Sequence, residues 1–306
     1  MKHSATDLRQ KQSLPLDAKV RMSQNRIRQW YEHWDGVVYV AFSGGKDSTA
    51  LLHLVRELYP EVPAVFCDTG LEYPEIREFV KTIENVTWLR PKMNFRQVIE
   101  KYGYPVVSKQ ISMGCHRYRC TTSDVQKQLR LWGGINPSSG KNQKPTISQK
   151  WHFLADAPFK ISEKCCDVMK KRPFYLFEKD SGLRPLIGTM ASNSNLRKQG
   201  WLKAGCNSFD ASTPKSTPLS FWLETDVWEY INTRNIPYCK IYDMGERQTG
   251  CMFCAFGIMH DTNPNRFQRM KLTHPKQWKF CMDTLGLRKV LEYIGVPCEA
   301  KEAIDA

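Results

Sequence analysis

The sequence lacks any apolar run long enough to cross a bilayer, and its first residues lack the apolar core of a signal peptide. We therefore expect a cytoplasmic protein with no membrane partner. Acidic residues are also comparatively few. The 31 Asp and Glu stand against 45 Lys and Arg, which gives a net charge of +14. This excess favours an anionic partner, such as a nucleotide or a nucleic acid.

The eleven cysteines do not resemble a disulfide framework, because their number is odd, they are clustered, and no secretion signal precedes them. Clustered cysteines in a reducing compartment indicate a metal site, an iron–sulfur cluster or redox chemistry. The 306 residues are 41% hydrophobic, which suits one large α/β domain or one domain with an appendage.

The most informative stretch begins with the apolar run Val37–Phe42, continues through a Ser-Gly-Gly-Lys-Asp-Ser turn, and enters a helical pattern at Ala50. A strand, a glycine loop and a helix in this order place backbone N–H groups and a helix N-terminus around an anion. The alternative is a tight turn whose glycines serve packing alone. The predicted phosphate-site residues are Ser43, Gly44, Gly45, Lys46, Asp47 and Ser48.

Further strands are expected at residues 64–70, Val86–Leu89 and Leu183–Ile187, with helices between them. This alternation predicts a doubly wound, mostly parallel α/β sheet. Ligands of such sheets bind at the carboxyl ends of the strands, so Asp68 should face the same site as the loop. We expect it to contact Mg²⁺ or ribose, with a simple turn residue as the alternative.

The glycine loop is not a Walker A motif, because the spacing differs. It resembles the PP-loop of the ATP pyrophosphatase superfamily. The resemblance implies an enzyme that binds ATP with Mg²⁺, cleaves it between the α and β phosphates and often adenylates a substrate. It implies catalytic roles for Lys46 and Asp47.

Three regions are predicted: an N-terminal helical segment at residues 1–36, an α/β domain at 37–262 with a flexible insertion near 133–150, and a basic helical region at 263–306. Residues 90–130 combine nine Lys and Arg with three tyrosines. This stretch and the basic C-terminal region could hold a nucleic acid, or be solvated faces. A loop ending at Lys109 presents a cation, which makes Lys109 a candidate catalytic residue. A helix is expected over 120–131.

Two local cysteine pairs stand out, and four thiolates of this kind suit Zn²⁺ or a [4Fe–4S] cluster. Adjacent cysteines diverge, which favours the larger cluster over a single ion; ordinary buried thiols are the alternative. The four candidate ligands are Cys165, Cys166, Cys251 and Cys254. Cys115 and Cys120 lie in a basic segment that should depress their pKa values, so they are candidate sulfur carriers, or else ordinary thiols.

From Val37 to Tyr293 the chain resembles the phosphoadenosine-phosphosulfate reductase family. Residues 165–173 match its Cys-Cys-x-x-x-Lys-x-x-Pro motif, and 249–254 match its final Cys-x-x-Cys segment. In iron–sulfur members the four cysteines hold a [4Fe–4S] cluster, and Lys170 would lie beside it. The family's nucleotide-binding turn corresponds to residues 188–197, where Gly188, Ser194 and Arg197 fit but Met190 and Asn193 depart from the pattern.

Two departures bear on the reaction. Sulfonucleotide reductases carry a degenerate phosphate loop, whereas this loop is intact. They also end in a Glu-Cys-Gly-Leu-His motif, and Cys298 lacks that context. We predict an ATP-dependent adenylating sulfurtransferase that uses a sulfur donor such as a cysteine desulfurase; a homodimer is compatible with the sequence. The alternatives are an adenylyl-sulfate or phosphoadenylyl-sulfate reductase with Cys298 as nucleophile, and a cluster-bearing nucleic-acid-binding module.

Overall fold

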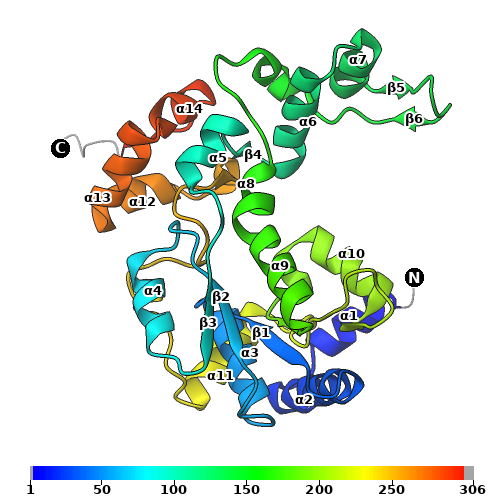
Figure 1. The fold of residues 1–306 in the computed structure, drawn as a ribbon, viewed down its shortest axis with the longest axis vertical. Helices are drawn as coiled ribbons and strands as arrows, with labels where there is room; N and C mark the ends of the chain where they lie inside the picture. The colour runs from blue at the N-terminus through cyan, green and yellow to red at the C-terminus, as the bar shows by residue number, and fades with distance from the viewer. Residues whose placement is uncertain (1–2, 300–306) are drawn as a thin grey trace. The chain divides into compact units, whose positions relative to one another are not determined.

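The computed structural model describes residues 3–299, and the chain divides into two compact units (Figure 1). Unit 1 comprises the residues up to Asp68, then Glu72–Arg90 and Pro173–Thr249. Unit 2 comprises Thr69–Leu71, Pro91–Arg172 and the residues from Gly250 onward. Within the described residues, no helix combines the length and the apolar character needed to span a membrane.

Unit 1 is built on a six-stranded sheet in the order β3-β2-β1-β7-β9-β8. All neighbouring pairs are parallel except β8 and β9. This confirms the predicted mostly parallel α/β sheet, with β3 at its predicted position. The strands are β1 (Val38–Ala41), β2 (Ala64–Cys67), β3 (Val86–Leu89), β7 (Arg184–Ile187), β8 (Asn207–Ser208) and β9 (Lys215–Ser216).

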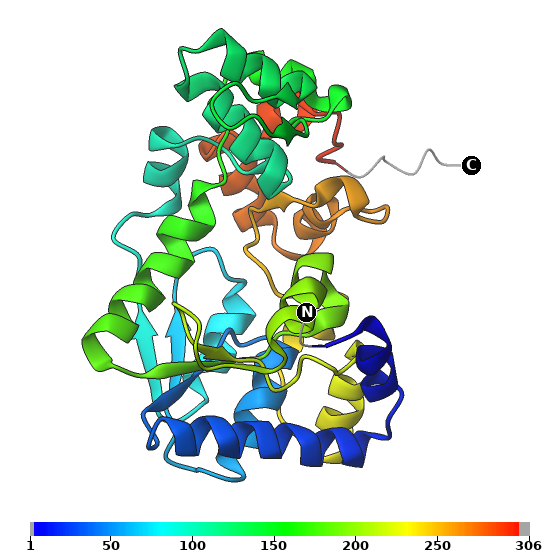
Figure 2. The same cartoon turned by 90° about the vertical axis from the view of Figure 1, so that its right-hand side faces the viewer.

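Helices cover both faces of this sheet, and Figure 2 shows α2 and α9 on opposite sides of it. On the α9 side, Tyr39 of β1 packs against Phe174 and Phe177. On the other side, α2, α3 and α11 pack together. The helices are α1 (Ala5–Gln12), α2 (Leu16–His33), α3 (Lys46–Arg56), α4 (Pro74–Lys81), α9 (Arg172–Ser181), α10 (Asn195–Ala204) and α11 (Glu224–Thr233), with 3-10 turns at Ala191–Asn193 and Lys240–Tyr242.

The N-terminal segment is part of unit 1. Lys19 of α2 is 2% exposed and its Nζ lies 2.7 Å from Asp226 Oδ2 of α11. The same Asp226 carboxylate accepts a hydrogen bond from the Leu223 N–H at the start of α11. A buried ion pair of this kind cross-links two helices that are distant in sequence, and losing either partner leaves the other charge buried alone.

Unit 2 is mainly helical, with two short β ladders. β4 pairs in parallel with β10, and β5 pairs antiparallel with β6. Its strands are β4 (Val106–Val107), β5 (Gly134–Ile135), β6 (Asn142–Gln143) and β10 (Ala255–Phe256). Its α-helices are α5 (Phe95–Lys101), α6 (Lys109–Cys120), α7 (Asp124–Trp132), α8 (Lys164–Cys166), α12 (Arg266–Thr273), α13 (Pro275–Lys279) and α14 (Leu287–Tyr293). Short 3-10 helices lie at Gln149–Asp156 and Ile258–His260, and short π-helices lie at Asp167–Lys171 and Phe280–Thr284.

The segment near 133–150, expected as a flexible insertion, forms the β5–β6 hairpin and leads into a 3-10 helix, and its flexibility stays a prediction. Two other expectations for unit 2 are corrected. Lys109 is the first residue of α6 rather than a loop residue, and Ser108 caps that helix. The helix expected over 120–131 begins four residues later, at Asp124.

Candidate functional site

The glycine loop of unit 1 follows β1 directly, and its glycines are required by geometry. Gly44 adopts φ +71°, which side-chain-bearing residues rarely tolerate. A Cβ at Gly45 would collide with the Thr249 hydroxyl. A Cβ at Gly188 would lie 2.7 Å from the Asp47 carbonyl oxygen. The close approach at Gly188 follows from strand register, because Ala41 pairs with Ile187 at the ends of β1 and β7.

A hydroxyl network holds the loop in place. Ser48 Oγ accepts a hydrogen bond from the Ser43 N–H at 3.1 Å and lies 2.9 Å from the Gly45 carbonyl oxygen, to which it donates. Thr49 Oγ1 donates to the same carbonyl at 3.1 Å. Helix α3 begins at Lys46 and has no side-chain cap. Its N-terminus is therefore suited to an anion, as the sequence predicts.

Lys46 is 4% exposed and lies among polar groups of unit 1. Its Nζ is 3.1 Å from Glu224 Oε1 and 3.2 Å from the Arg247 carbonyl oxygen. Its backbone N–H donates to the Tyr242 hydroxyl at 2.8 Å. Burial lowers the pKa of Lys46, but Asp47, Tyr242 and Glu224 outweigh it, so the pKa is raised. The side chain therefore stays cationic beside the loop.

Asp47 places a carboxylate at the same site. Its Oδ1 is buried, accepts no hydrogen bond and lies 3.6 Å from Lys46 Nζ. Burial raises the pKa of Asp47, although Lys46 and a hydrogen bond from Asn193 counteract it. A buried carboxylate oxygen without a donor is a suitable ligand for Mg²⁺.

Asp68 is in a different environment. Its Oδ2 lies 2.9 Å from Arg77 Nη2 and 4.0 Å from Arg90 Nε. Two guanidinium groups therefore lie near this carboxylate, and its predicted contact to Mg²⁺ or ribose stays a prediction. Arg197 is exposed on α10, where the Ser194 hydroxyl caps the helix by accepting the Arg197 N–H. Its predicted role in binding nucleotide also stays a prediction.

Sequence reasoning missed four residues around the loop: Glu224, Tyr242, Arg247 and Thr249. They lie about 180 to 200 positions from the loop, so no local pattern connects them to it. The available signal was the position of residues 242–249 immediately before the Cys-x-x-Cys motif, in a segment rich in polar side chains.

The two cysteine pairs lie together in unit 2. Cys165 and Cys166 are on α8, which continues into a π-turn, and their Sγ atoms are 3.9 Å apart. Cys251 and Cys254 form a tight turn closed by a hydrogen bond from the Cys254 N–H to the Cys251 carbonyl at 3.1 Å. The thiols of Cys251 and Cys254 both raise the pKa of Cys165 electrostatically, so the structure brings the two pairs into one region.

Cations surround these thiols. The hydrogen bond from Cys165 lowers the pKa of Cys166 against its burial, and Lys109 and Lys170 lower it further. Lys170 therefore lies near the cysteines, as the family resemblance implies. Arg266 donates to the carbonyl oxygens of Cys254 and Phe256 at 3.2 and 3.1 Å.

The arrangement does not form a mononuclear metal site. Within residues 3–299, no group of three or more His, Cys, Asp or Glu side chains could hold a metal ion. None of the eleven cysteines forms a disulfide there either. The four thiols have the donor chemistry of a thiolate-ligated group, and the identity of that group stays a prediction.

The other candidate thiols, those of Cys115, Cys120 and Cys298, differ in their exposure to solvent. Cys115 is fully buried and burial raises its pKa to about 11, so the expected depression is wrong. Cys120 is exposed, with its Sγ 3.9 Å from His116 Nε2, and its role as a sulfur carrier stays a prediction. Cys298 is 5% exposed and burial raises its pKa to about 11, which opposes a role as nucleophile in this conformation.

The basic stretch at 90–130 lies almost entirely in unit 2, and the positive charge is concentrated there. Unit 2 contains 24 Lys and Arg against 11 Asp and Glu, whereas unit 1 contains 21 against 20. Arg119 is structural, because its guanidinium donates to the carbonyl oxygens of Leu154, Ala155, Ala157 and Phe159. Unit 2 therefore carries nearly all of the net charge.

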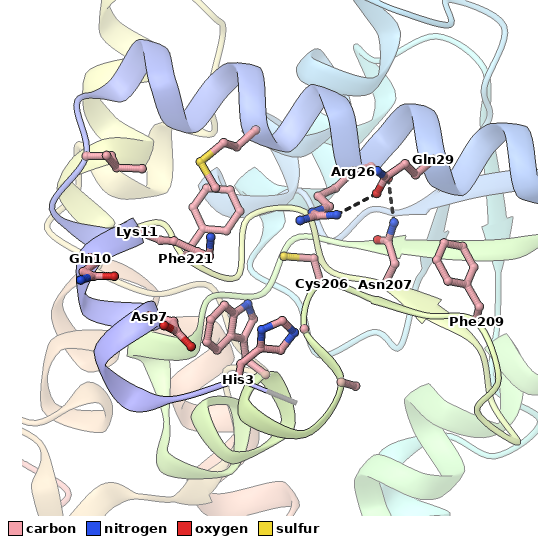
Figure 3. Close-up of a pocket in the computed structure, with 15 residues that line it drawn as sticks. His3, Asp7, Gln10, Lys11, Arg26, Gln29, Cys206, Asn207, Phe209 and Phe221 are labelled. Carbon is pink, nitrogen blue, oxygen red and sulfur yellow. Dashed lines mark hydrogen bonds between the residues drawn. The ribbon is translucent and has the colours of Figure 1, made fainter. Parts of the chain in front are cut away.

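Unit 1 also contains a cavity of about 430 Å³ formed by α1, α2 and the end of α10 (Figure 3). Arg26 donates to Gln29 Oε1 at 2.8 Å, and Asn207 donates to the Arg26 carbonyl at 3.0 Å. Burial raises the pKa of Cys206, which faces this cavity. None of the predicted site residues lines it, so it is distinct from the phosphate loop.

Comparison with known proteins identifies one family model, described as the phosphoadenosine phosphosulfate reductase domain, which matches residues 37–122 and 113–256. An adenosine 5'-phosphosulfate reductase of Geobacillus kaustophilus is 26% identical over 84% of this chain and 87% of its own length. An uncharacterized protein of Methanocaldococcus jannaschii is 22% identical over 87% of this chain. The chain spans about half the length of that relative, 52%.

Among solved structures, a phosphoadenylyl-sulfate reductase from Candida auris, crystallised with phosphate, has a TM-score of 0.44 and 17% identity. The similarity covers 78% of this chain and 96% of that one.

Proposed function

The chain belongs to the phosphoadenosine phosphosulfate reductase domain family and has a PP-loop α/β fold, and from this premise we propose that it is an ATP-dependent adenylating sulfurtransferase. The family includes enzymes named as adenosine 5'-phosphosulfate reductases. The intact loop is the observation that carries the proposal. It joins an uncapped helix N-terminus, a buried cationic Lys46 and the Asp47 carboxylate at one strand edge.

The first chemical step is the attack of a substrate oxygen on the α-phosphorus of ATP. The bond from that phosphorus to the bridging oxygen breaks, and pyrophosphate leaves while the substrate becomes adenylated. Loop N–H groups and Lys46 stabilise the negative charge that develops on the leaving group. Lys46 Nζ donates to the Arg247 carbonyl oxygen, and the Lys46 backbone N–H donates to the Tyr242 hydroxyl. When pyrophosphate binds, phosphate oxygens replace these two acceptors. The terminal sulfur of the donor persulfide then attacks the adenylated carbon and displaces AMP, and a second thiol of the donor cleaves the resulting S–S bond, which leaves one sulfur on the substrate and a disulfide on the donor.

Two groups accompany this chemistry. Mg²⁺ would be held by Asp47 together with the phosphates, and would supply charge neutralisation. A [4Fe–4S] cluster would be held by Cys165, Cys166, Cys251 and Cys254, and would supply electron or sulfur chemistry. Lys109 and Lys170 would offset the negative charge of a thiolate-ligated cluster, and both already act on the Cys166 thiol.

The acceptor proposed for the sulfur is a nucleic acid, because the positive charge is concentrated in unit 2. A cysteine desulfurase would serve as sulfur donor. Both partners, a homodimeric state and a cytoplasmic location are proposals that follow from the sequence.

The test is pyrophosphate release from ATP by the purified full chain, with and without bulk RNA as candidate acceptor. Lys46→Ala should reduce the rate by about 10²–10³-fold, because it removes a cation from the leaving group. Lys198→Ala, which changes an exposed lysine of the same unit, is the matched control and should leave the rate unchanged. Equal rates for Lys46→Ala and the wild type would show that the mechanism is wrong.

The second candidate is a sulfonucleotide reductase, which the names of the similar proteins favour. It predicts sulfite release from adenylyl sulfate and a thiol reductant without any ATP. The intact loop and the buried Cys298 weigh against it. Sulfite production that is lost in Cys298→Ser and retained in Lys46→Ala would establish the reductase and exclude the sulfurtransferase.

A further inference from the structure

Unit 2 carries a continuous run of aromatic side chains, here called the aromatic strip: Tyr104, Phe159, Tyr293, Phe153 and Trp151. Successive ring centroids are 5.9, 5.3, 5.6 and 5.8 Å apart. Phe153 is 43% exposed and Tyr293 is 39% exposed. The Tyr104–Phe159 and Phe159–Tyr293 pairs are edge to face, and the other two pairs are tilted. Trp151 is buried, so Tyr293 and Phe153 in the middle of the strip are the rings that solvent reaches most, as two adjacent exposed aromatic side chains.

Cations flank both ends of the strip. At one end, Tyr104 and Phe159 line a cavity of about 380 Å³ together with Arg96, Lys160 and Lys289. Glu100 is the one carboxylate in its lining, and Lys160 donates to the Glu100 carbonyl oxygen rather than to its carboxylate. At the other end, Lys150 Nζ lies 5.2 Å from the centre of the Trp151 ring.

The strip is held by backbone contacts from several segments. The Tyr104 hydroxyl donates to the Leu285 carbonyl at 2.7 Å, and the Tyr104 N–H donates to the Lys160 carbonyl at 2.9 Å. Arg119 binds four carbonyl oxygens of residues 154–159, the segment between Phe153 and Lys160. The rings are thus ordered before any ligand arrives, which reduces the entropic cost of binding.

From this juxtaposition we infer that the aromatic strip is the binding surface for single-stranded nucleic acid. Unpaired bases stack on Tyr293 and Phe153, one base enters the cavity beside Tyr104, and the lysines and Arg96 contact the phosphates. Stacking platforms combined with cations bind single strands largely without sequence preference. A duplex hides its base faces and so gains only the phosphate contacts. This inference rests on the proposed function for its biological context, since it specifies the nucleic acid acceptor proposed above.

The two basic stretches identified in the sequence meet in this surface. Arg96 and Tyr104 come from the stretch at 90–130, while Lys289 and Tyr293 come from α14 in the C-terminal region. An acidic peptide would use the cations but gain little from a row of flat ring faces. The combination of rings and cations therefore favours a nucleic acid.

The experiment is fluorescence anisotropy of the full chain with labelled twelve-nucleotide single strands of RNA and of DNA, and with the matching duplexes. No ATP is added. Phe153→Ala and Tyr293→Ala should each weaken single-strand binding about tenfold, as expected when one base loses its stacking partner. Tyr175→Ala, which removes an exposed aromatic ring of unit 1, is the matched control and should bind normally. The RNA and DNA arms decide which strand is preferred.

Salt dependence provides a second readout. Lys160→Ala combined with Lys289→Ala should weaken binding, and should reduce the slope of log K against log salt by about 0.7 for each phosphate that no longer meets a cation. Circular dichroism confirms that each variant is folded. Normal single-strand binding by the folded ring variants would overturn the inference. Duplex binding at least as tight as single-strand binding would also overturn it. So would a strip variant that changes the oligomeric state and leaves strand binding unchanged.

The outcomes separate this inference from the proposed function. Strip variants that bind normally, in a protein that still releases pyrophosphate, refute the strip alone. If the wild-type protein cleaves no ATP but its binding to single strands still depends on Phe153, the adenylation chemistry alone is refuted.

Discussion

The two units of this chain differ sharply in charge and in chemistry. Unit 1 is close to neutral, with 21 Lys and Arg against 20 Asp and Glu, and contains the phosphate loop. Unit 2 has 24 against 11, and contains the four neighbouring cysteines and the aromatic strip. A single phosphate site requires only a few directed groups, whereas binding a polyanion requires charge spread over a surface.

The comparison teaches that the overall charge of +14 does not describe the phosphate site. The positive groups at the loop are one lysine and the partial charge of a helix end, and they are buried beside Asp47 and Glu224. In unit 2 the cations are largely exposed and outnumber the carboxylates about two to one. Four predictions test this division.

The largest effect is expected for the cysteines of unit 2. Protein purified without oxygen should be brown and contain about four irons and four sulfides per chain. Cys251→Ser should lose the visible absorption, whereas Cys120→Ser, which changes an exposed thiol of the same unit, should retain it. A colourless wild-type protein with one zinc per chain would contradict the proposed ligand set.

In unit 1, the largest loss of folding stability is expected when the buried ion pair of Lys19 and Asp226 is broken. Lys19→Met leaves the Asp226 carboxylate buried without its cation, and should lower the free energy of unfolding by about 3–5 kcal/mol. Urea denaturation measures this difference. Lys240→Met changes an exposed lysine and should alter it by less than about 0.5 kcal/mol. A small effect of Lys19→Met would mean that the two helices are not joined by this pair.

A smaller effect should come from the packing of β7 on the loop. Gly188→Ala forces the Asp47 backbone to move, because the added Cβ would lie 2.7 Å from its carbonyl oxygen. Overpacking of this kind costs about 1–3 kcal/mol, and ATP should bind about tenfold more weakly. Gly200→Ala meets no atom within 4 Å and should leave ATP affinity unchanged. If calorimetry gave equal ATP affinities for Gly188→Ala and the wild type, Gly188 would not contribute to the ATP site.

The smallest effect is a difference between two thiols on α6. The pKa of Cys115 is about 11, which is about three units above pH 8. At pH 8, roughly one Cys115 side chain in a thousand is therefore a thiolate. Its thiolate fraction rises with pH, since the deprotonated form gains about tenfold per unit. Iodoacetamide should label the exposed Cys120 readily and spare Cys115, as peptide mass spectrometry would show. Equal labelling would mean that α6 opens in solution.

Local sequence patterns predicted the elements of the phosphate site well. The run at 37–42, the glycine loop and β3 lie where hydrophobic pattern and turn chemistry indicate. Helix α6 was missed because Gly114 interrupts its pattern. That glycine is required by tertiary packing, since a Cβ there would lie 2.7 Å from Ile147 Cγ1. Tyr242 and Thr249 could not be assigned to the loop, because their contacts depend on the fold rather than on neighbours in sequence.

The aromatic strip shows the same limit. Tyr104 and Tyr293 are almost 190 residues apart, and only the fold joins them through Phe159. The sequence predicted a basic stretch with interleaved tyrosines, but it did not distinguish Arg119, which holds backbone carbonyls, from cations available to a ligand.

The most direct test of the account is the identity of the products formed from ATP. The full chain is incubated with ATP, Mg²⁺, RNA and a persulfide donor, and phosphorus NMR identifies the products. An adenylating enzyme forms AMP and pyrophosphate in equal amounts, and Lys46→Ala forms neither. ADP with inorganic phosphate, or sulfite from adenylyl sulfate with ATP left intact, would contradict the central claim.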